Sequence, residues 1–272
     1  MTDTLLLSER AVLSVTGEEA ESFLDGLLTN SVTNMQSGDQ RYAALLTPQG
    51  KIIADMIMSL IEDGFLIDCP SQADQTLLKR LKLFKLKAKV DIDERTDLAV
   101  YAFHDDGLPD PRSADLATRH IGVRKEDEGF ADSAYHSARI AAGIPEFGVD
   151  FGAEDAFPAD VNMDMIGGVD FKKGCFVGQE VVSRMKRRGT ARRRTLRLDF
   201  EESAPTRGAA IMAGDAQIGE ITSRESKSAL ARIRIDRMAK AEAKGDAINV
   251  DGEPAIIVKP DWLAGELEAV VK

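Results

Sequence analysis

Cysteine is scarce in this sequence of 272 residues, which contains only Cys69 and Cys175. Two cysteines cannot form a disulfide framework, so a single bridge between them is the one disulfide that the sequence allows. So low a cysteine content is typical of proteins in a reducing compartment. We therefore expect a cytoplasmic protein.

Long apolar runs are also missing. The run Ile52–Ile61 is among the longest, yet Asp55 interrupts it, and residues 1–4 lack the basic start of a signal peptide. We expect a soluble protein that neither inserts into a membrane nor is exported. With 43% hydrophobic and 30% charged residues, the chain can bury the core of one large domain or two smaller ones.

Familiar metal, hydrolase and nucleotide motifs are absent as well. His104, His120 and His136 lie sixteen residues apart, which is not a zinc-ligand spacing, so we expect no metal site from this chain alone. An iron–sulfur cluster usually needs four ligands, and Cys175 can supply at most one. The chain has no Gly-x-Ser-x-Gly elbow, no GxGxxG and no P-loop, so no such hydrolase or nucleotide-binding enzyme is indicated.

The net charge of the chain is negative, but its charges are unevenly distributed. The net charge is −11, but Arg184 to Arg197 contains eight basic residues and no acid, so the remainder carries −19. A cationic segment on an acidic body favours anion binding at that one place, although such a run can also be a solvated surface. RNA binding is a further reading, but the run lacks the aromatic residues on which bases stack, so nucleic acid is not the expected partner.

The periodicity of the chain predicts an α+β fold. Up to residue 142 it alternates strands and helices in the order β-α-β-β-β-α-β, followed by a short helix, which favours antiparallel or mixed sheets with packed helices. The expected strands are residues 10–17, 42–46, 51–61, 65–69, 90–92 and 98–103, and the expected helices are 18–28, 71–86 and 132–142. After Thr195 the texture changes to short strands, which predicts a small β-barrel or sandwich. We expect residues 1–194 to form one domain, with up to two subdomains, and residues 195–272 to form a second.

The segment Phe171–Glu180 is the most chemically dense part of the chain. It combines two glycines, a thiol and two lysines, and a helical pattern follows it. Cys175 is therefore expected in a tight turn near a helix N-terminus, where the helix dipole and the lysines favour the thiolate. A small buried core cysteine is the structural alternative.

Within this segment, Lys173-Gly174-Cys175-Phe176-Val177-Gly178-Gln179-Glu180 resembles the K-G-C-[YF]-x-G-Q-E signature of the YgfZ family. This family comprises folate-binding-type proteins of iron–sulfur cluster assembly or repair, related to the glycine cleavage T-protein, an aminomethyltransferase. Other matching segments occur in the same order along the chain. They are residues 15–30, 46–52, 143–145 and 218–223.

The resemblance implies a T-protein-like folate-binding body with a C-terminal β-barrel. It implies a tetrahydrofolate-type ligand, iron–sulfur client enzymes or assembly proteins as partners, a polyglutamate tail held by the basic run, and a link to tRNA modification. Cys175 is the implied reactive thiol, and Lys173 the residue that lowers its pKa. The implied cofactor-binding residues are Asp55, Arg139, Gly174, Phe176, Gly178, Gln179, Glu180, Arg184 and Arg194.

Two positions depart from the T-protein pattern. Ala54 precedes Asp55 where T-proteins have paired acids, and Ala141 replaces the glutamate that holds the pterin in relatives. Loss of that carboxylate removes an acceptor for the pterin N–H groups. A non-enzymatic or weakly enzymatic accessory assembly factor is therefore the leading hypothesis, and a tetrahydrofolate-dependent one-carbon transferase that uses Asp55 alone is the alternative.

Overall fold

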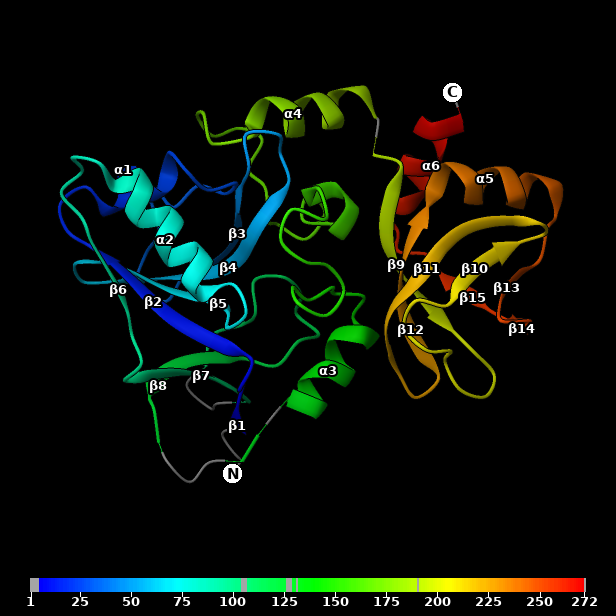
Figure 1. The fold of residues 1–272 in the computed structure, drawn as a ribbon, viewed down its shortest axis with the longest axis horizontal. Coiled ribbons are helices and arrows are strands. Elements are labelled where there is room, and N and C mark those ends of the chain that lie inside the picture. The colour runs from blue at the N-terminus through cyan, green and yellow to red at the C-terminus, as the bar shows by residue number, and fades with distance from the viewer. Residues whose placement is uncertain (1–4, 104–106, 126–128, 131, 190, 272) are drawn as a thin grey trace.

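The computed structural model describes residues 5–271 apart from 104–106, 126–128, 131 and 190. In this part of the chain, two sheets form an N-terminal body with packed helices, and a third forms a C-terminal barrel beside it (Figure 1). This arrangement confirms the predicted α+β fold.

The five-stranded sheet of the body has the order β3-β4-β5-β2-β6 and is antiparallel throughout. Its strands in that order are Gln40–Leu46, Ile52–Ile61, Gly64–Pro70, Arg10–Thr16 and Asp91–Glu94. Helices α1 (Ala20–Asp25) and α2 (Asp74–Lys85) pack on it through buried side chains such as Leu24 and Leu77. Most of β4 is buried, which explains its nearly continuous apolar sequence.

A smaller sheet, β1-β7-β8, lies at the lower edge of the body in Figure 1. Its strands are Leu5–Leu6, Leu98–Ala102 and Arg119–Val123, and α3 (Asp132–Ala141) follows it in the chain. The sequence patterns predicted β7 and α3 but not β8. Strand β8 contains Arg119 and His120 among few apolar residues, so it has no alternating signal.

The segment after α3 runs through the 3₁₀-helix η1 (Pro158–Val161) to the motif turn, which we define as residues 171–178. Helix α4 (Gln179–Arg188) begins directly after this turn. It spans the top of the molecule toward the barrel in Figure 1. The predicted helix after Gly178 is therefore confirmed.

The barrel sheet has the strand order β14-β13-β10-β11-β12-β9-β15. These strands are Glu253–Pro254, Ile248–Val250, Ala210–Ala213, Ala216–Glu225, Ser228–Arg234, Arg193–Asp199 and Ile256–Val258. Helices α5 (Ile235–Lys244) and α6 (Leu263–Val271) cover one end, and Met238, Ala241 and Leu263 enter the barrel core.

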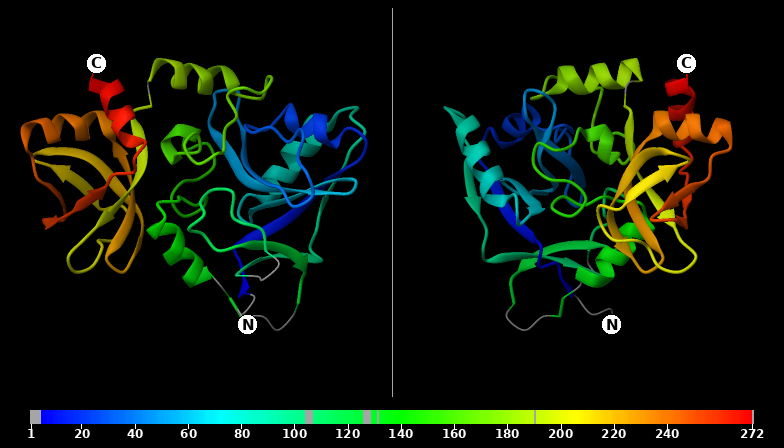
Figure 2. Two further views of the ribbon diagram at one scale, coloured as in Figure 1. Left: turned by 180° about the vertical axis from the view of Figure 1, so that it is seen from behind. Right: turned by 45° about the vertical axis from the view of Figure 1, so that its right-hand side comes forward.

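Buried polar contacts fix the barrel against the body, and both views of Figure 2 show the two parts side by side. On α4's side, Arg194 pairs with Asp164 at 2.6 Å and with Glu266 at 2.6 Å. On α3's side, Asp150 accepts hydrogen bonds from the hydroxyls of Thr222 at 2.5 Å and Ser223 at 2.6 Å. The predicted domain boundary after residue 194 falls at the start of β9.

Candidate functional site

The motif turn is held by close backbone packing. Gly178 has φ +81°, and a Cβ there would lie 2.7 Å from the carbonyl oxygen of Thr47 and 3.1 Å from Cα of Gly50. The turn at Thr47–Gly50 joins β3 to β4, so the glycine lets the start of α4 rest directly on this hairpin. Gln179 donates its side-chain amide to the carbonyl of Gly174 at 3.2 Å, which closes the turn from the helix side.

Lys173 anchors the same turn to the body. Its ammonium donates to the carbonyl oxygens of Asp25, Leu28 and Asn30 at 2.6, 2.9 and 3.1 Å, and the Asp25 carboxylate lies 3.4 Å away. Burial lowers the pKa of Lys173, while Asp25 opposes that shift. These three carbonyls use all three ammonium protons, so Lys173 stabilises the turn; its effect on the thiol of Cys175 stays a prediction.

Cys175 is exposed, whereas Cys69 is buried in the body core. The disulfide that the sequence allowed does not form, because both thiols are free. Phe176, by contrast, is buried beneath the turn, and the centroid of its ring lies 5.6 Å from the Lys173 ammonium. The turn therefore presents one thiol at the surface while its neighbours anchor it.

Helix α4, which follows the motif turn, carries several cationic side chains, most of them in its last turn at the end away from Cys175. Glu180 and Arg184 are exposed, and the last turn carries Lys186, Arg187 and Arg188. Cations at a helix C-terminus interact favourably with the helix dipole. Arg194, also predicted to bind the cofactor, is 1% exposed and engaged with Asp164 and Glu266, so its role is to fix the barrel and the helix that ends it.

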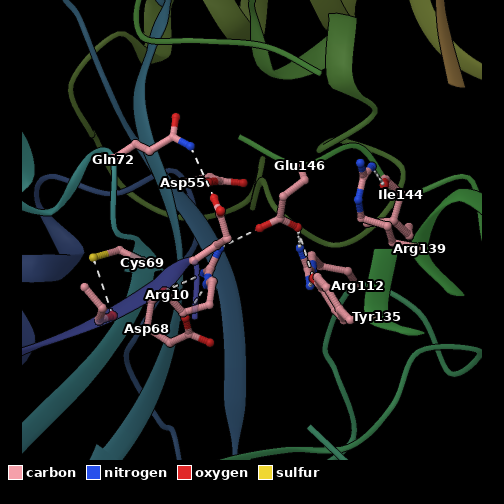
Figure 3. Close-up of polar contacts among 12 residues, drawn as sticks. Arg10, Asp55, Asp68, Cys69, Gln72, Arg112, Tyr135, Arg139, Ile144 and Glu146 are labelled. Atoms are coloured by element: carbon pink, nitrogen blue, oxygen red, sulfur yellow. Dashed lines mark hydrogen bonds and ion pairs between the residues drawn. The ribbon is translucent and has the colours of Figure 1, made fainter. Parts of the chain in front are cut away.

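A second polar centre lies inside the body, and we call it the arginine–carboxylate cluster (Figure 3). Its members are buried and come from both sheets, from α3 and from the connecting loops. They are Arg10, Asp68, Asp110, Arg112, Arg119, Tyr135 and Glu146.

Each arginine of the cluster is paired by two carboxylates. Arg10 contacts Asp68 at 2.5 Å and Glu146 at 2.7 Å. Arg112 binds Asp110 through two nitrogens at 2.9 and 2.7 Å and reaches Glu146 at 3.2 Å. Arg119 contacts Asp68 at 2.6 Å and Asp110 at 3.2 Å. Such pairs stabilise only while all partners are present.

The charges of the cluster balance without Asp55, which lies next to it. Three arginines face three carboxylates, and burial would raise the pKa of Glu146, but Arg10 and Arg112 bring it down to about 2. Asp55 instead has a raised pKa, first because it is buried and second because Glu146 is already negative. Its Oδ2 accepts a hydrogen bond from the Tyr42 hydroxyl at 2.7 Å, and its Oδ1 has no hydrogen-bond partner among the described residues.

A cavity of about 330 Å³, the Glu146 cavity, opens beside the cluster. It is lined on one side by Arg10, Tyr135 and Glu146 and on the other by apolar groups that include Phe147. Asp55 is 2% exposed and does not line this cavity, so its predicted contact with a ligand is not supported. Arg139 lines it, but its guanidinium is bound to Asp150 at 2.6 Å and to the Ile144 carbonyl at 3.2 Å.

The predicted residues thus fall in separate places. Those of the 173–184 segment gather at the motif turn, whereas Arg139 borders the Glu146 cavity. Sequence reasoning missed Arg10, Arg112, Arg119 and Glu146, whose spacing over 137 positions follows no local motif. Within the residues that the structure describes, no group of three or more His, Cys, Asp or Glu side chains could hold a metal ion, and His104 lies outside them.

Comparison with known proteins accounts for both parts of the fold. Residues 7–130 match the GCVT N-terminal domain, and residues 192–265 match the CAF17 C-terminal beta-barrel domain. The crystal structure of the glycine cleavage system aminomethyltransferase T from Bartonella henselae superimposes with a TM-score of 0.76 at 19% identity, covering 96% of this chain and 85% of that one. The chain therefore has a GCVT-like T-protein fold with a CAF17-type C-terminal β-barrel domain.

Several curated proteins that the chain is similar to are IBA57 proteins. The iron–sulfur cluster assembly factor IBA57 homologs of Neurospora crassa and Coccidioides immitis are 30% and 33% identical, over 73% and 70% of this chain. The human factor IBA57 is 29% identical over 74% of this chain and 67% of its own length. The chain spans about half the length of the two fungal relatives, 54% and 55%. The comparisons confirm the aminomethyltransferase-like fold, and these relatives are named IBA57 where the motif suggested YgfZ.

The expected cytoplasmic location is wrong by the same comparison, because these relatives are all named as mitochondrial proteins. Low cysteine content could not distinguish the two locations, since it indicates a reducing environment and does not identify the compartment. Among the helices of the described chain, none is long and apolar enough to cross a membrane.

Proposed function

We propose that this chain is an accessory factor in iron–sulfur cluster assembly or repair that presents Cys175 to a partner protein. The observation that carries the proposal is an exposed thiol on a turn anchored by Lys173 and Gly178. One thiolate is a fraction of the ligand set of a cluster, so the partner supplies the remaining ligands. The names of the relatives support an assembly role.

The partner class follows from the charges on helix α4, which begins directly after the turn that bears the thiol. The exposed α4 face carries Arg184, Arg187 and Arg188, on a chain whose net charge is −11. A cationic face favours association with an acidic protein surface and steers its approach. The partners are therefore iron–sulfur assembly proteins or client enzymes with an acidic surface near the cluster ligands.

Cys175→Ser tests the proposal in a strain that lacks the native gene. We expect iron–sulfur enzyme activity to fall to the level of the deletion strain at unchanged protein abundance, because serine keeps the size but not the thiolate. Cys69→Ala is the matched control, since Cys69 is buried and its removal leaves the turn intact. Wild-type activity of the Cys175→Ser strain would refute the thiol role.

A tetrahydrofolate-type ligand is the second part of the proposal, and the Glu146 cavity is its site. A volume of about 330 Å³ lies in the range of small-molecule sites, and the cavity combines apolar walls with a carboxylate that can accept hydrogen bonds from ring N–H groups. Glu146 then supplies the acceptor that Ala141 lacks. The one-carbon transferase alternative has weaker support, because Asp55 lies outside this cavity.

Calorimetry with tetrahydrofolate checks the site. We expect wild type to bind, and Val149→Trp to weaken binding at least about tenfold by filling the cavity that Val149 lines. Ala141→Glu is the control, because Ala141 is exposed and borders a different cavity. Unchanged affinity of Val149→Trp, or a gain of affinity in Ala141→Glu alone, would show that the ligand does not use the Glu146 cavity.

A further inference from the structure

A second polar cavity lies on the barrel, away from the Glu146 cavity. It has a volume of about 390 Å³ and is formed by strands β9, β11 and β12, the start of α5 and a loop of the body. Four arginines line it, and we call it the arginine cleft. They are Arg193, Arg232, Arg234 and Arg237.

The sheet register places three of these arginines on one face. Arg193 of β9 is directly opposite Arg234 of β12, and Arg232 is two residues earlier on the same strand. The intervening Arg194 and Ile233 point to the opposite face, where they are 1% and 0% exposed. Like charges directly across a strand pair destabilise a sheet, so this pairing has an energetic cost that the fold itself does not explain.

The hydrogen bonds of the cleft leave donors unused. Arg234 is paired with Asp236 through two nitrogens at 2.8 and 2.7 Å. Arg237 donates one N–H to the carbonyl of Gln217 at 2.7 Å, and Arg193 has no hydrogen bond or ion pair with another described residue. A guanidinium carries five donors, so most free donors of the cleft belong to Arg193 and Arg237.

The carboxylates beside the cleft limit its size without neutralising it. Arg232 reaches Asp155 at 2.7 Å and Glu220 at 3.5 Å. Asp155, Glu220 and Asp236 are three acids beside four arginines, so the cleft keeps a positive charge on a chain whose net charge is −11. The free donors of Arg193 and Arg237 can therefore contact a compact anion, whereas an extended polyanion would meet Asp155 and Glu220.

We propose that the arginine cleft binds a small ligand that bears a diphosphate or phosphate-ester group. Guanidinium groups match phosphate oxygens with paired, charge-assisted hydrogen bonds, which is the chemistry that the unused donors offer. Among the residues that the structure describes, no aromatic side chain lines the cleft, so a stacked base is not part of the recognised group. This site is independent of the iron–sulfur role proposed for Cys175.

The test is calorimetry with inorganic diphosphate at low ionic strength. We expect wild type to bind and Arg193→Ala/Arg237→Ala to bind at least about tenfold more weakly, with a smaller dependence on salt. Arg192→Ala/Arg207→Ala is the matched control, because both arginines are exposed, one is the neighbour of Arg193, and neither lines the cleft. This control removes the same charge and should retain wild-type affinity.

Three results would overturn the proposal: no binding of diphosphate by wild type, equal weakening by the control pair, or equal affinity for tri-γ-glutamate at the same ionic strength. The last result would mean that any anion suffices. Since the Arg193 side chain is exposed and has no hydrogen bond or ion pair with a described residue, Arg193→Ala alone should weaken binding without lowering the thermal midpoint.

Discussion

Replacing Arg112 with alanine is expected to lower the free energy of unfolding by about 3 to 5 kcal/mol, because it breaks a buried ion-pair network on one side only. The Arg112 side chain is 1% exposed, and its two bonds to Asp110 lie at 2.9 and 2.7 Å. Its removal also takes one donor from Glu146 and one from the hydroxyl of Tyr135. The remaining carboxylates stay buried with fewer cations, and water cannot replace the lost partners.

Urea denaturation at neutral pH measures this effect, with the midpoint and slope compared between variants. Arg95→Ala is the matched control, since Arg95 also binds an aspartate two residues away through two nitrogens, at 2.8 and 2.7 Å, but on the surface. We expect no measurable change for this control, because exposed ion pairs contribute little. A similar midpoint for both variants would contradict the network model.

Acid titration is a second measurement for wild type and Arg112→Ala, and it compares the pH at which each protein unfolds. In the folded protein the pKa of Glu146 is about 2 and that of Asp110 lies below its usual range; burial opposes both shifts, and the arginines cause them. These depressed pKa values contribute stability above the unfolded pKa values, and that stability is lost as pH falls through the folded ones. Arg112→Ala raises both folded pKa values, so acid unfolding should begin at a higher pH than in wild type.

Gly178→Ala is expected to lower the free energy of unfolding by about 2 to 3 kcal/mol, since φ +81° is costly for an L-residue and the new Cβ meets backbone. The nearest atom, the Thr47 carbonyl oxygen, would be 2.7 Å away and belongs to a hairpin turn that cannot move independently. The start of α4 must then lift from this turn, which displaces Cys175.

Gly174→Ala separates this geometric effect from the loss of a glycine in general. A Cβ at Gly174 has no atom within 4 Å, and its backbone is not in the left-handed region, so we expect near wild-type stability. The midpoint of urea denaturation and the iron–sulfur enzyme activity should both fall for Gly178→Ala. Both should stay at the wild-type level for Gly174→Ala. Equal effects of the two substitutions would show that the contact with Thr47 is not what fixes the turn.

Local patterns were sufficient to predict most of the body. The helical spacing of Leu77, Leu78 and Leu81 gave α2, and the turn at residues 62–64 between two apolar runs gave the β4–β5 hairpin. Strand β8 could not be found this way, because it is short and polar and gains its order from pairing with β7. The predicted helix at residues 18–28 proved to be only Ala20–Asp25, since Gly26 follows it and Leu28 forms a bridge with Leu45.

The candidate site divides along the same line. The motif turn was predictable because its chemistry lies in ten consecutive residues. The arginine–carboxylate cluster was not, because Arg10, Asp68 and Glu146 meet only after both sheets have formed and each looks like an ordinary surface charge in sequence. Arg194 shows the opposite case. It belongs to a basic run, and nothing in that run indicated that the Arg194 side chain is buried against Asp164.

The carboxylate of Asp150 joins two regions that are distant in sequence. It accepts hydrogen bonds from Arg139 and from the backbone N–H of Glu146 at the cavity wall, and from Thr222 and Ser223 of the barrel. The cavity wall and the barrel therefore share the Asp150 carboxylate as acceptor. A shift of either part would break hydrogen bonds that this carboxylate makes with the other part. Thermodynamic linkage makes this coupling reciprocal. If a ligand binds the cavity more tightly when the barrel is docked, the bound ligand strengthens the docking of the barrel by the same factor.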